Sequence, residues 1–202
     1  SPAIHAAFAA QCRQDLIYEA ILAPRDGFVD AVRSFVAGSG RGANVTVPFK
    51  EEACLLANRL TDRAMVAGAV NTLWLADDGQ LHGDNTDGAG LVRDLRHNLG
   101  WRIAGVRVLL LGAGGAVRGV VGPLLQQAPA ALVIANRSED KALALARQFA
   151  SAGPVRGCGF DALVGPFDLV INGTSASLQG EVPPLGDELL ALWEGGSATR
   201  LD

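Results

Sequence analysis

The sequence is poor in aromatic residues and in cysteine. Aromatic residues make up 5% of the 202 residues, whereas 25 residues are glycine, a profile that favours an α/β protein over an all-β sandwich. The three cysteines (Cys12, Cys54 and Cys158) show neither a metal-ligand spacing nor a CxxC pair, and the three histidines are equally dispersed. We therefore predict reduced, structural cysteines and no metal site.

Strong charge and long hydrophobic runs are also missing. The net charge of -4 leaves no basic stripe, which argues against a nucleic-acid partner. The longest apolar runs, such as Val106 to Leu111, are too short to cross a bilayer, and the N-terminus shows no secretion signal. These absences predict a cytoplasmic protein without a membrane segment. The hydrophobic fraction of 49% is nevertheless enough to bury one large core or two small ones.

The chain changes in texture between residues 86 and 100. Before this point, short strand and helix patterns alternate irregularly, and an Asp77-Asp78-Gly79 turn indicates a hairpin. The elements expected in this half are a strand at Leu16–Leu22, helices at Asp26–Ala37 and from Pro48 onward, and strands at Ala69–Leu75 and Leu81–Gly83.

The second half reads as strands alternating with helices. A helical pattern follows Asp87, with apolar residues at Leu91, Val92 and Leu95 on one face. Nearly continuous apolar strands separated by helices indicate a parallel sheet that is buried on both faces. We therefore predict two α/β domains, residues 1–86 and 87–202, of which the second has a doubly wound parallel sheet. Its strands are expected at Val106–Leu111, Ala131–Ala135 and Phe167–Ile171.

A glycine-rich turn follows the first of these strands directly. It comprises Gly112, Ala113, Gly114, Gly115 and Ala116. Glycine permits a tight turn and lets the backbone approach a pyrophosphate, and the following helix N-terminus supplies free N–H groups. A strand before the turn and a helix after it form the context that a dinucleotide site requires. A plain tight turn remains the alternative.

The end of the second strand indicates which dinucleotide would bind. An NAD site usually places Asp or Glu here, but this chain has Asn136-Arg137-Ser138, followed by Lys141. Ser138 is in position to cap the next helix, and Lys141 in its first turn opposes the helix dipole. Two cations at this edge predict the 2′-phosphate of NADP, with solvated surface cations as the alternative. Thr174 follows the third strand at the same sheet edge and is expected near the nicotinamide.

Three polar residues in and just after the first half are candidates for chemistry. Lys50 falls just after Pro48, where a cation at a helix start is unfavourable, and a positioned ammonium is suited to proton transfer. Taken alone, Lys50 is also explained by an ordinary solvated lysine. Asp87 precedes a helix, so a simple N-cap would also explain it. Asn71 lies within an apolar stretch, where its amide needs backbone or ligand partners. None of the three identifies a substrate by itself.

Several motifs occur in the order found in one known family. These are Gly42-Ala43-Asn44-Val45-Thr46-Val47-Pro48-Phe49-Lys50, Gly68-Ala69-Val70-Asn71-Thr72, Gly83-Asp84-Asn85-Thr86-Asp87-Gly88, the turn Gly112–Ala116, Asn136-Arg137-Ser138 and Asn172-Gly173-Thr174-Ser175. Together they resemble the NADP-dependent shikimate dehydrogenases along nearly the whole chain. The resemblance implies an α/β substrate domain followed by a Rossmann-type NADP domain.

The resemblance also implies a reaction and residue roles. The family reduces 3-dehydroshikimate to shikimate with NADPH, in aromatic amino acid biosynthesis. By that resemblance Lys50 is the proton shuttle, with Asp87 as its hydrogen-bonded partner. Thr46 and Asn71 would contact ring hydroxyls, and Ser1 the substrate carboxylate. Asp62 corresponds to an acidic residue near the cofactor.

The sequence departs from the family pattern at both ends. It begins inside the family's serine-rich N-terminal motif, and the match fades after Ser175, so we expect a truncated chain. Two alternatives remain open: a quinate/shikimate dehydrogenase paralogue, and a truncated, non-catalytic nucleotide-binding protein. The sequence leaves open whether the chain is a monomer or a homodimer.

Overall fold

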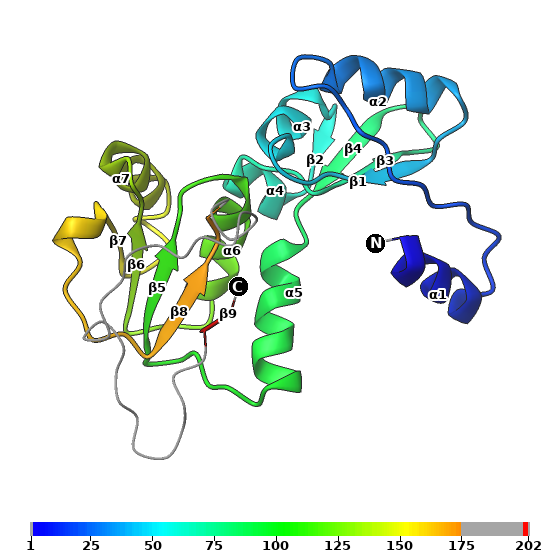
Figure 1. Cartoon of the computed structure of the whole chain (residues 1–202). Coiled ribbons are helices and arrows are strands. Elements are labelled where there is room, and N and C mark those ends of the chain that lie inside the picture. Colours follow the sequence, from blue (N-terminus) through cyan, green and yellow to red (C-terminus); the bar gives the residue numbers. More distant parts are fainter. Residues whose placement is uncertain (1, 175–199, 202) are drawn as a thin grey trace.

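The protein is described by a computed structural model that covers residues 2–174 and 200–201. Its strands form two separate sheets, joined by the helices that lie between them (Figure 1). We refer to residues 2–86 as the N-terminal half and to the remaining described residues as the C-terminal half. The chain passes from one half to the other between β4 and α5, at Thr86–Asp87.

The N-terminal half is built on a four-stranded sheet of order β1-β3-β4-β2. β3 pairs antiparallel with both β1 and β4, whereas β2 pairs parallel with β4. The expected hairpin turn joins β3 to β4, with Gly79 in the left-handed region at φ 76°. The elements are α1 (Pro2–Cys12), α2 (Phe28–Ala37), β1 (Gly42–Asn44), α3 (Lys50–Leu56), β2 (Arg59–Leu60), α4 (Asp62–Ala67), β3 (Thr72–Leu75) and β4 (Leu81–Asp84).

The C-terminal half is built on a five-stranded, all-parallel sheet of order β7-β6-β5-β8-β9. The central strands are buried on both faces, as their apolar sequence predicts. The elements are α5 (Asp87–Arg93), a π-helical turn (Asp94–Asn98), β5 (Arg107–Leu111), α6 (Gly115–Leu125), β6 (Ala131–Ala135), α7 (Glu139–Gln148), β7 (Val155–Cys158), a 3₁₀ turn (Phe160–Ala162), β8 (Leu169–Asn172) and β9 (Arg200–Leu201).

The two faces of this sheet are covered differently. α5, α6 and α7 pack on one face, in a core that includes Leu110, Val121 and Leu145. In the described residues, the other face is covered by the 3₁₀ turn and the loop that carries Phe167. The α/β class with a Rossmann-type sheet is confirmed, with helices on one face of the part described.

The expected strand at Leu16–Leu22 is wrong. This segment is extended but pairs with no strand in the part of the chain that the structure describes. Its side chains are correspondingly open, with Ile17 85% and Leu22 97% exposed. A short run rich in apolar residues is not sufficient for a strand, because the ladder also needs a neighbouring strand to complete its hydrogen bonds. In Figure 1 α1 lies apart from the sheets, whereas the segment touches β1, since the Tyr18 hydroxyl donates to Asn44 Oδ1 at 2.9 Å.

Other expectations were right in kind and wrong in extent. The helix expected to open at Pro48 begins at Lys50, and the Val47–Pro48 bond is cis. The strand expected from Ala69 begins only at Thr72. Within residues 2–174 and 200–201, none of the helices has the length and apolar content needed to span a membrane.

Candidate active site between the two halves

The structure brings Lys50, Asn71 and Asp87 together. Lys50 Nζ donates to Asp87 Oδ2 at 2.6 Å, and Asn71 Nδ2 donates to Asp87 Oδ1 at 2.7 Å. The Lys50 and Asp87 side chains are 12% and 26% exposed, so the ion pair is largely shielded while still open to a ligand. One carboxylate thus holds both a cation and an amide in place.

Local structure explains how each residue reaches this point. Lys50 is the first residue of α3, and its carbonyl accepts a hydrogen bond from Val70 N at 2.8 Å. Asp87 is the first residue of α5 and follows the N-cap position, which Thr86 occupies without a side-chain cap bond. Asp87 is therefore not the N-cap of the alternative reading, and its carboxylate accepts from Lys50 and Asn71 instead.

The Asn71 amide finds the partners that its position demands. Besides Asp87, its Nδ2 group contacts Thr86 Oγ1 at 3.0 Å, and its Oδ1 accepts from Thr86 N at 3.0 Å and from Thr72 Oγ1 at 2.9 Å. Asn71 lies at a bend just before β3 and not inside the strand. Its orientation is fixed before any ligand arrives.

The two other residues expected at the substrate are placed less completely. Thr46 is exposed, and its carbonyl accepts from Phe49 N at 3.0 Å in the turn that leads to α3. Thr46 therefore lies in the turn that immediately precedes Lys50, the first residue of α3. Ser1 lies outside the described residues.

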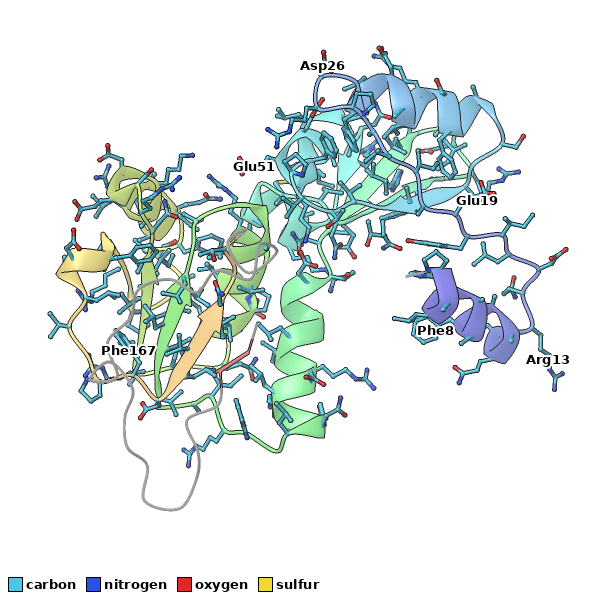
Figure 2. All side chains as sticks on the ribbon, viewed as in Figure 1. Phe8, Arg13, Glu19, Asp26, Glu51 and Phe167 are labelled. Atoms are coloured by element: carbon cyan, nitrogen blue, oxygen red, sulfur yellow. The ribbon has the colours of Figure 1, made fainter. Side chains whose placement is uncertain are left out.

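The glycine-rich turn opens a pocket of about 420 Å³. Gly112 has φ 104°, which L-residues rarely adopt, and a Cβ at Gly114 would meet no atom within 4 Å. The free N–H groups of α6, which begins at Gly115, lie at this turn. The pocket is lined by Glu51, Ala113, Gly114, Arg118, Asn136, Arg137, Ser138, Asp140, Lys141 and Ala144. Figure 2 labels Glu51 on the side of the N-terminal half that faces the other sheet.

The cationic residues expected at the second strand do line this pocket. Arg137 and Lys141 are both exposed, on either side of the N-cap Ser138. Ser138 makes no side-chain cap bond to α7, and its carbonyl accepts from Asn136 Nδ2 at 2.9 Å. Ser138 therefore occupies the expected N-cap position but does not make the side-chain hydrogen bond of a cap. The polar rim and open glycine turn fit the phosphates of a dinucleotide.

Thr174 and Asp62 are placed apart from that pocket. Thr174 Oγ1 donates to Asn172 Oδ1 at 2.8 Å, and a Cβ at Gly112 would lie 3.4 Å from Thr174 Cγ2, so Thr174 borders the turn. Asp62 instead lines a second pocket of about 350 Å³, together with Arg63, Val66 and Gly122.

The turn and the polar cluster touch one another. A Cβ on Gly115 would lie 2.9 Å from Lys50 Cβ, closer than side chains normally approach. Glycine is therefore required here for the N-terminus of α3 to rest on the turn. The Lys50–Asp87 ion pair, which itself joins the two halves, is consequently next to the dinucleotide turn.

Sequence reasoning missed several polar residues around the site. Arg118 lies between the halves, with Nη1 donating to Gln148 Oε1 at 3.2 Å and Nε 3.6 Å from Glu51 Oε1. Asp84 accepts hydrogen bonds from Arg63 and Thr61, and the Arg63 bond lowers the pKa of the Asp84 carboxyl from its usual 3.8 to about 2. The basic residue one turn into α6 was a visible signal, whereas Asp84 lay inside the Gly83–Gly88 motif with nothing to indicate its pairing with Arg63.

A parallel sheet with a glycine-rich turn at the end of a strand, and a lysine–aspartate pair beside that turn, define a dinucleotide-dependent oxidoreductase. The family model described as "Shikimate dehydrogenase substrate binding domain" matches residues 1–73. The model described as "Shikimate / quinate 5-dehydrogenase" matches residues 94–179.

Individual relatives agree with the family models. Shikimate dehydrogenase (NADP(+)) of Dechloromonas aromatica is 62% identical over 95% of this chain and 70% of its own length. The Ael1 enzyme of Pseudomonas putida is 46% identical with a TM-score of 0.82, over 93% of this chain and 69% of that chain. Shikimate 5-dehydrogenase of Thermus thermophilus, solved with NADP(H) and shikimate, is 30% identical with a TM-score of 0.78, over 94% of this chain and 69% of that chain. The chain belongs to the shikimate dehydrogenase family.

Proposed function

We propose that this chain carries the NADP-dependent interconversion of 3-dehydroshikimate and shikimate, a step of aromatic amino acid biosynthesis. The observation that carries the proposal is the contact between the Lys50–Asp87 pair and Gly115 of the dinucleotide turn. An acid–base group and a hydride donor must meet at one carbonyl, and this contact brings their two sites together.

When bound, NADPH would supply the hydride for the carbonyl carbon of the ring. Lys50 Nζ would then give a proton to the ring oxygen as negative charge develops there, and would recover one in the reverse direction. Asp87 would keep the ammonium oriented toward that oxygen through its 2.6 Å hydrogen bond. A positioned acid of this kind is worth about 10²–10⁴-fold in rate.

The remaining polar residues would hold the substrate. Asn71 is already oriented by Asp87 and Thr86, so it is suited to bind a ring hydroxyl without further ordering. Thr46 is exposed on the approach to Lys50 and would take a second hydroxyl. We assign the substrate carboxylate to Ser1, which lies outside the described residues, on the resemblance alone.

The pocket beside the turn would hold NADP. The backbone of Gly112, Ala113, Gly114, Gly115 and Ala116 would take the pyrophosphate, and Arg137 and Lys141 the 2′-phosphate, with Asn136 and Ser138 completing the rim. Thr174 would border the nicotinamide. Asp62 has no such support from its position and keeps a cofactor role only by resemblance.

Location and assembly are proposals of the same kind. We place the protein in the cytoplasm, because the substrate and cofactor belong to central biosynthesis. A monomer or a homodimer would both serve the proposed site, since its described residues come from one chain.

The test is to mix the purified chain with shikimate and NADP and to follow NADPH by its absorbance. We expect turnover that Lys50→Ala lowers by about 10²–10⁴-fold. Leu55→Ala is the matched control, because Leu55 lies on the same helix and its side chain is 88% exposed. Turnover unaffected by Lys50→Ala would contradict the assigned role.

Quinate and NAD are run in parallel. A higher kcat/KM for quinate than for shikimate would identify the chain as the quinate/shikimate dehydrogenase paralogue. A higher kcat/KM for NAD than for NADP would contradict the role assigned to Arg137. NADP binding measured by calorimetry without turnover of either acid would favour the non-catalytic alternative.

A further inference from the structure

Asn85 is a buried amide outside the roles assigned so far. Its side chain is 2% exposed, and among the described residues only Asn172 shares its status as a buried polar side chain. A buried amide of this kind must be matched by hydrogen-bond partners. Asn85 Nδ2 donates to Ala69 O at 3.0 Å, and Asn85 Oδ1 accepts from Asp87 N at 3.2 Å.

These two hydrogen bonds close a ring through the catalytic pair. Starting from Lys50, its carbonyl accepts from Val70 N at 2.8 Å, and the preceding Ala69 carbonyl accepts from Asn85. Asn85 in turn accepts from the Asp87 amide, and the Asp87 carboxylate accepts from Lys50 Nζ. The backbones of the two catalytic residues are therefore tied together by the side chain of Asn85.

The C-terminal half presses directly on this amide. A Cβ on Gly119 of α6 would lie 2.5 Å from Asn85 Oδ1 and 2.7 Å from Asn85 Nδ2. Beside it, a Cβ on Gly88 of α5 would lie 2.3 Å from Gly119 O. Helix α6 begins at the dinucleotide turn. The Asn85 side chain therefore contacts both the helix that carries this turn and the backbone of the catalytic pair.

We infer that Asn85 is a positioning residue, which sets the distance between the Lys50–Asp87 pair and the dinucleotide turn through its contact with Gly119. The inference rests on the proposed function. It predicts a loss of kcat with cofactor binding preserved, because a displacement of about 1 Å at a reacting group costs on the order of 10²-fold in rate.

The first variant is Asn85→Asp, which keeps the shape and the acceptor but turns the donor into a carboxylate oxygen facing Ala69 O. We expect kcat to fall by about 10²-fold at neutral pH, with the Kd for NADP unchanged within about threefold. Protonation restores an O–H donor to Ala69 O, so the ratio of N85D to parental kcat should rise as the pH is lowered. A flat ratio across pH would overturn the inference, because a merely structural defect would not be repaired by one proton.

The second variant leaves Asn85 in place and displaces it from outside. Gly119→Ala should lower kcat by about tenfold or more, since its Cβ overlaps the amide. Gly122→Ala is the matched control on the same helix, because its Cβ would meet only Phe149 Cε1 at 3.4 Å. Gly90→Ala is the control on α5, where a Cβ would meet nothing within 4 Å. Equal activity of G119A and G122A would overturn the inference.

A readout without turnover separates this inference from the proposed function. Amide hydrogen exchange at Asp87 should quicken by about fivefold in Asn85→Ala and in Gly119→Ala, but not in Gly122→Ala. If the parental chain turns over neither acid, the proposed function fails while the exchange rates still decide the positioning role. Unchanged exchange in both variants would overturn that role, and Asn85→Asp and Gly119→Ala still decide it if Asn85→Ala does not fold.

Discussion

The five-stranded sheet and the four-stranded sheet differ in how they are buried. Strands β5, β6 and β8 are buried on both faces, and Val108, Leu109 and Leu110 have no exposed surface. The four-stranded sheet has strands of two to four residues and a smaller core around Val70 and Leu73. One half has a thick, continuous core, and the other is held by short strands and polar contacts.

This difference teaches where each site gets its precision. The dinucleotide turn consists of consecutive residues fixed by the strand and helix on either side. The Lys50–Asp87 pair joins residues 37 positions apart, so it depends on side-chain hydrogen bonds between the first residues of two helices. Substitutions that weaken the five-stranded sheet should therefore disturb the dinucleotide turn. Substitutions that remove a side-chain hydrogen bond should disturb the Lys50–Asp87 pair.

The largest expected effect comes from cavities in the two cores. Leu110→Ala should lower the free energy of unfolding by about 4 kcal/mol, within the usual 2–5 kcal/mol for a buried leucine. Leu73→Ala should cost about 1 kcal/mol less, because the smaller core can collapse around the gap. Urea unfolding of both chains measures the two values. A greater loss for Leu73→Ala would reverse the comparison.

The next effect isolates the C-terminal half. Arg137→Ala should raise the KM for NADP by about 10- to 100-fold, the equivalent of one charged hydrogen bond, while leaving the KM for shikimate and that for NAD nearly unchanged. Arg147→Ala is the control, since Arg147 is exposed on α7 but does not line the pocket. An equal rise in the KM for NAD would show that Arg137 does not contact the 2′-phosphate.

A smaller effect isolates the N-terminal half. The folded-state pKa of Asp84 is about 2, below its usual 3.8, chiefly because of the hydrogen bond from Arg63. A lowered folded pKa gives stability that is present above pH 3.8 and is lost as the pH falls toward 2. Since Arg63 is partly exposed, we expect about 1–2 kcal/mol. The difference in unfolding free energy between the parental chain and Asp84→Asn should therefore shrink from pH 5 to pH 2, and a constant difference would contradict the pairing.

The smallest effects compare one N-cap from each half. Thr61 Oγ1 accepts from Ala64 N at 3.3 Å and donates to Asp84 Oδ1 at 2.6 Å, so Thr61→Ala should cost about 1 kcal/mol. Ser138 makes no cap bond, so Ser138→Ala should change stability by less than about 0.5 kcal/mol. Thermal melts of the two chains without cofactor would measure both, and equal losses would contradict the difference in capping.

The sequence was most informative where the composition of a single strand determines its burial. The strands at 107–111, 131–135 and 169–172 were expected within two residues, because long apolar runs can only be buried. The strand β7 was missed, since Val155–Cys158 contains Arg156 and Gly157 and has no apolar run. β1 was missed for the same reason, as Gly42–Asn44 is recognisable only by its pairing with β3.

The candidate site was predictable in its members but not in its arrangement. Lys50, Asn71 and Asp87 were each singled out as locally unusual, yet their meeting followed from the family resemblance and not from spacing. Asn85 lies inside the Gly83–Gly88 motif but was not singled out, because a polar residue before a helix is ordinary until its burial is known. The segment Leu16–Leu22 shows the opposite error, in which a good local pattern lacks a neighbour.

The single passage of the described chain between the halves, at Thr86–Asp87, has a consequence for how the protein is made. Residues 1–86 leave the ribosome before the helix that presses on Asn85 has been synthesised. Until α6 docks, nothing fixes Lys50 against Gly115. During refolding from denaturant, the recovery of turnover should therefore be slower than the recovery of the helical circular dichroism signal. The time course of enzyme activity would then measure how fast the two halves dock.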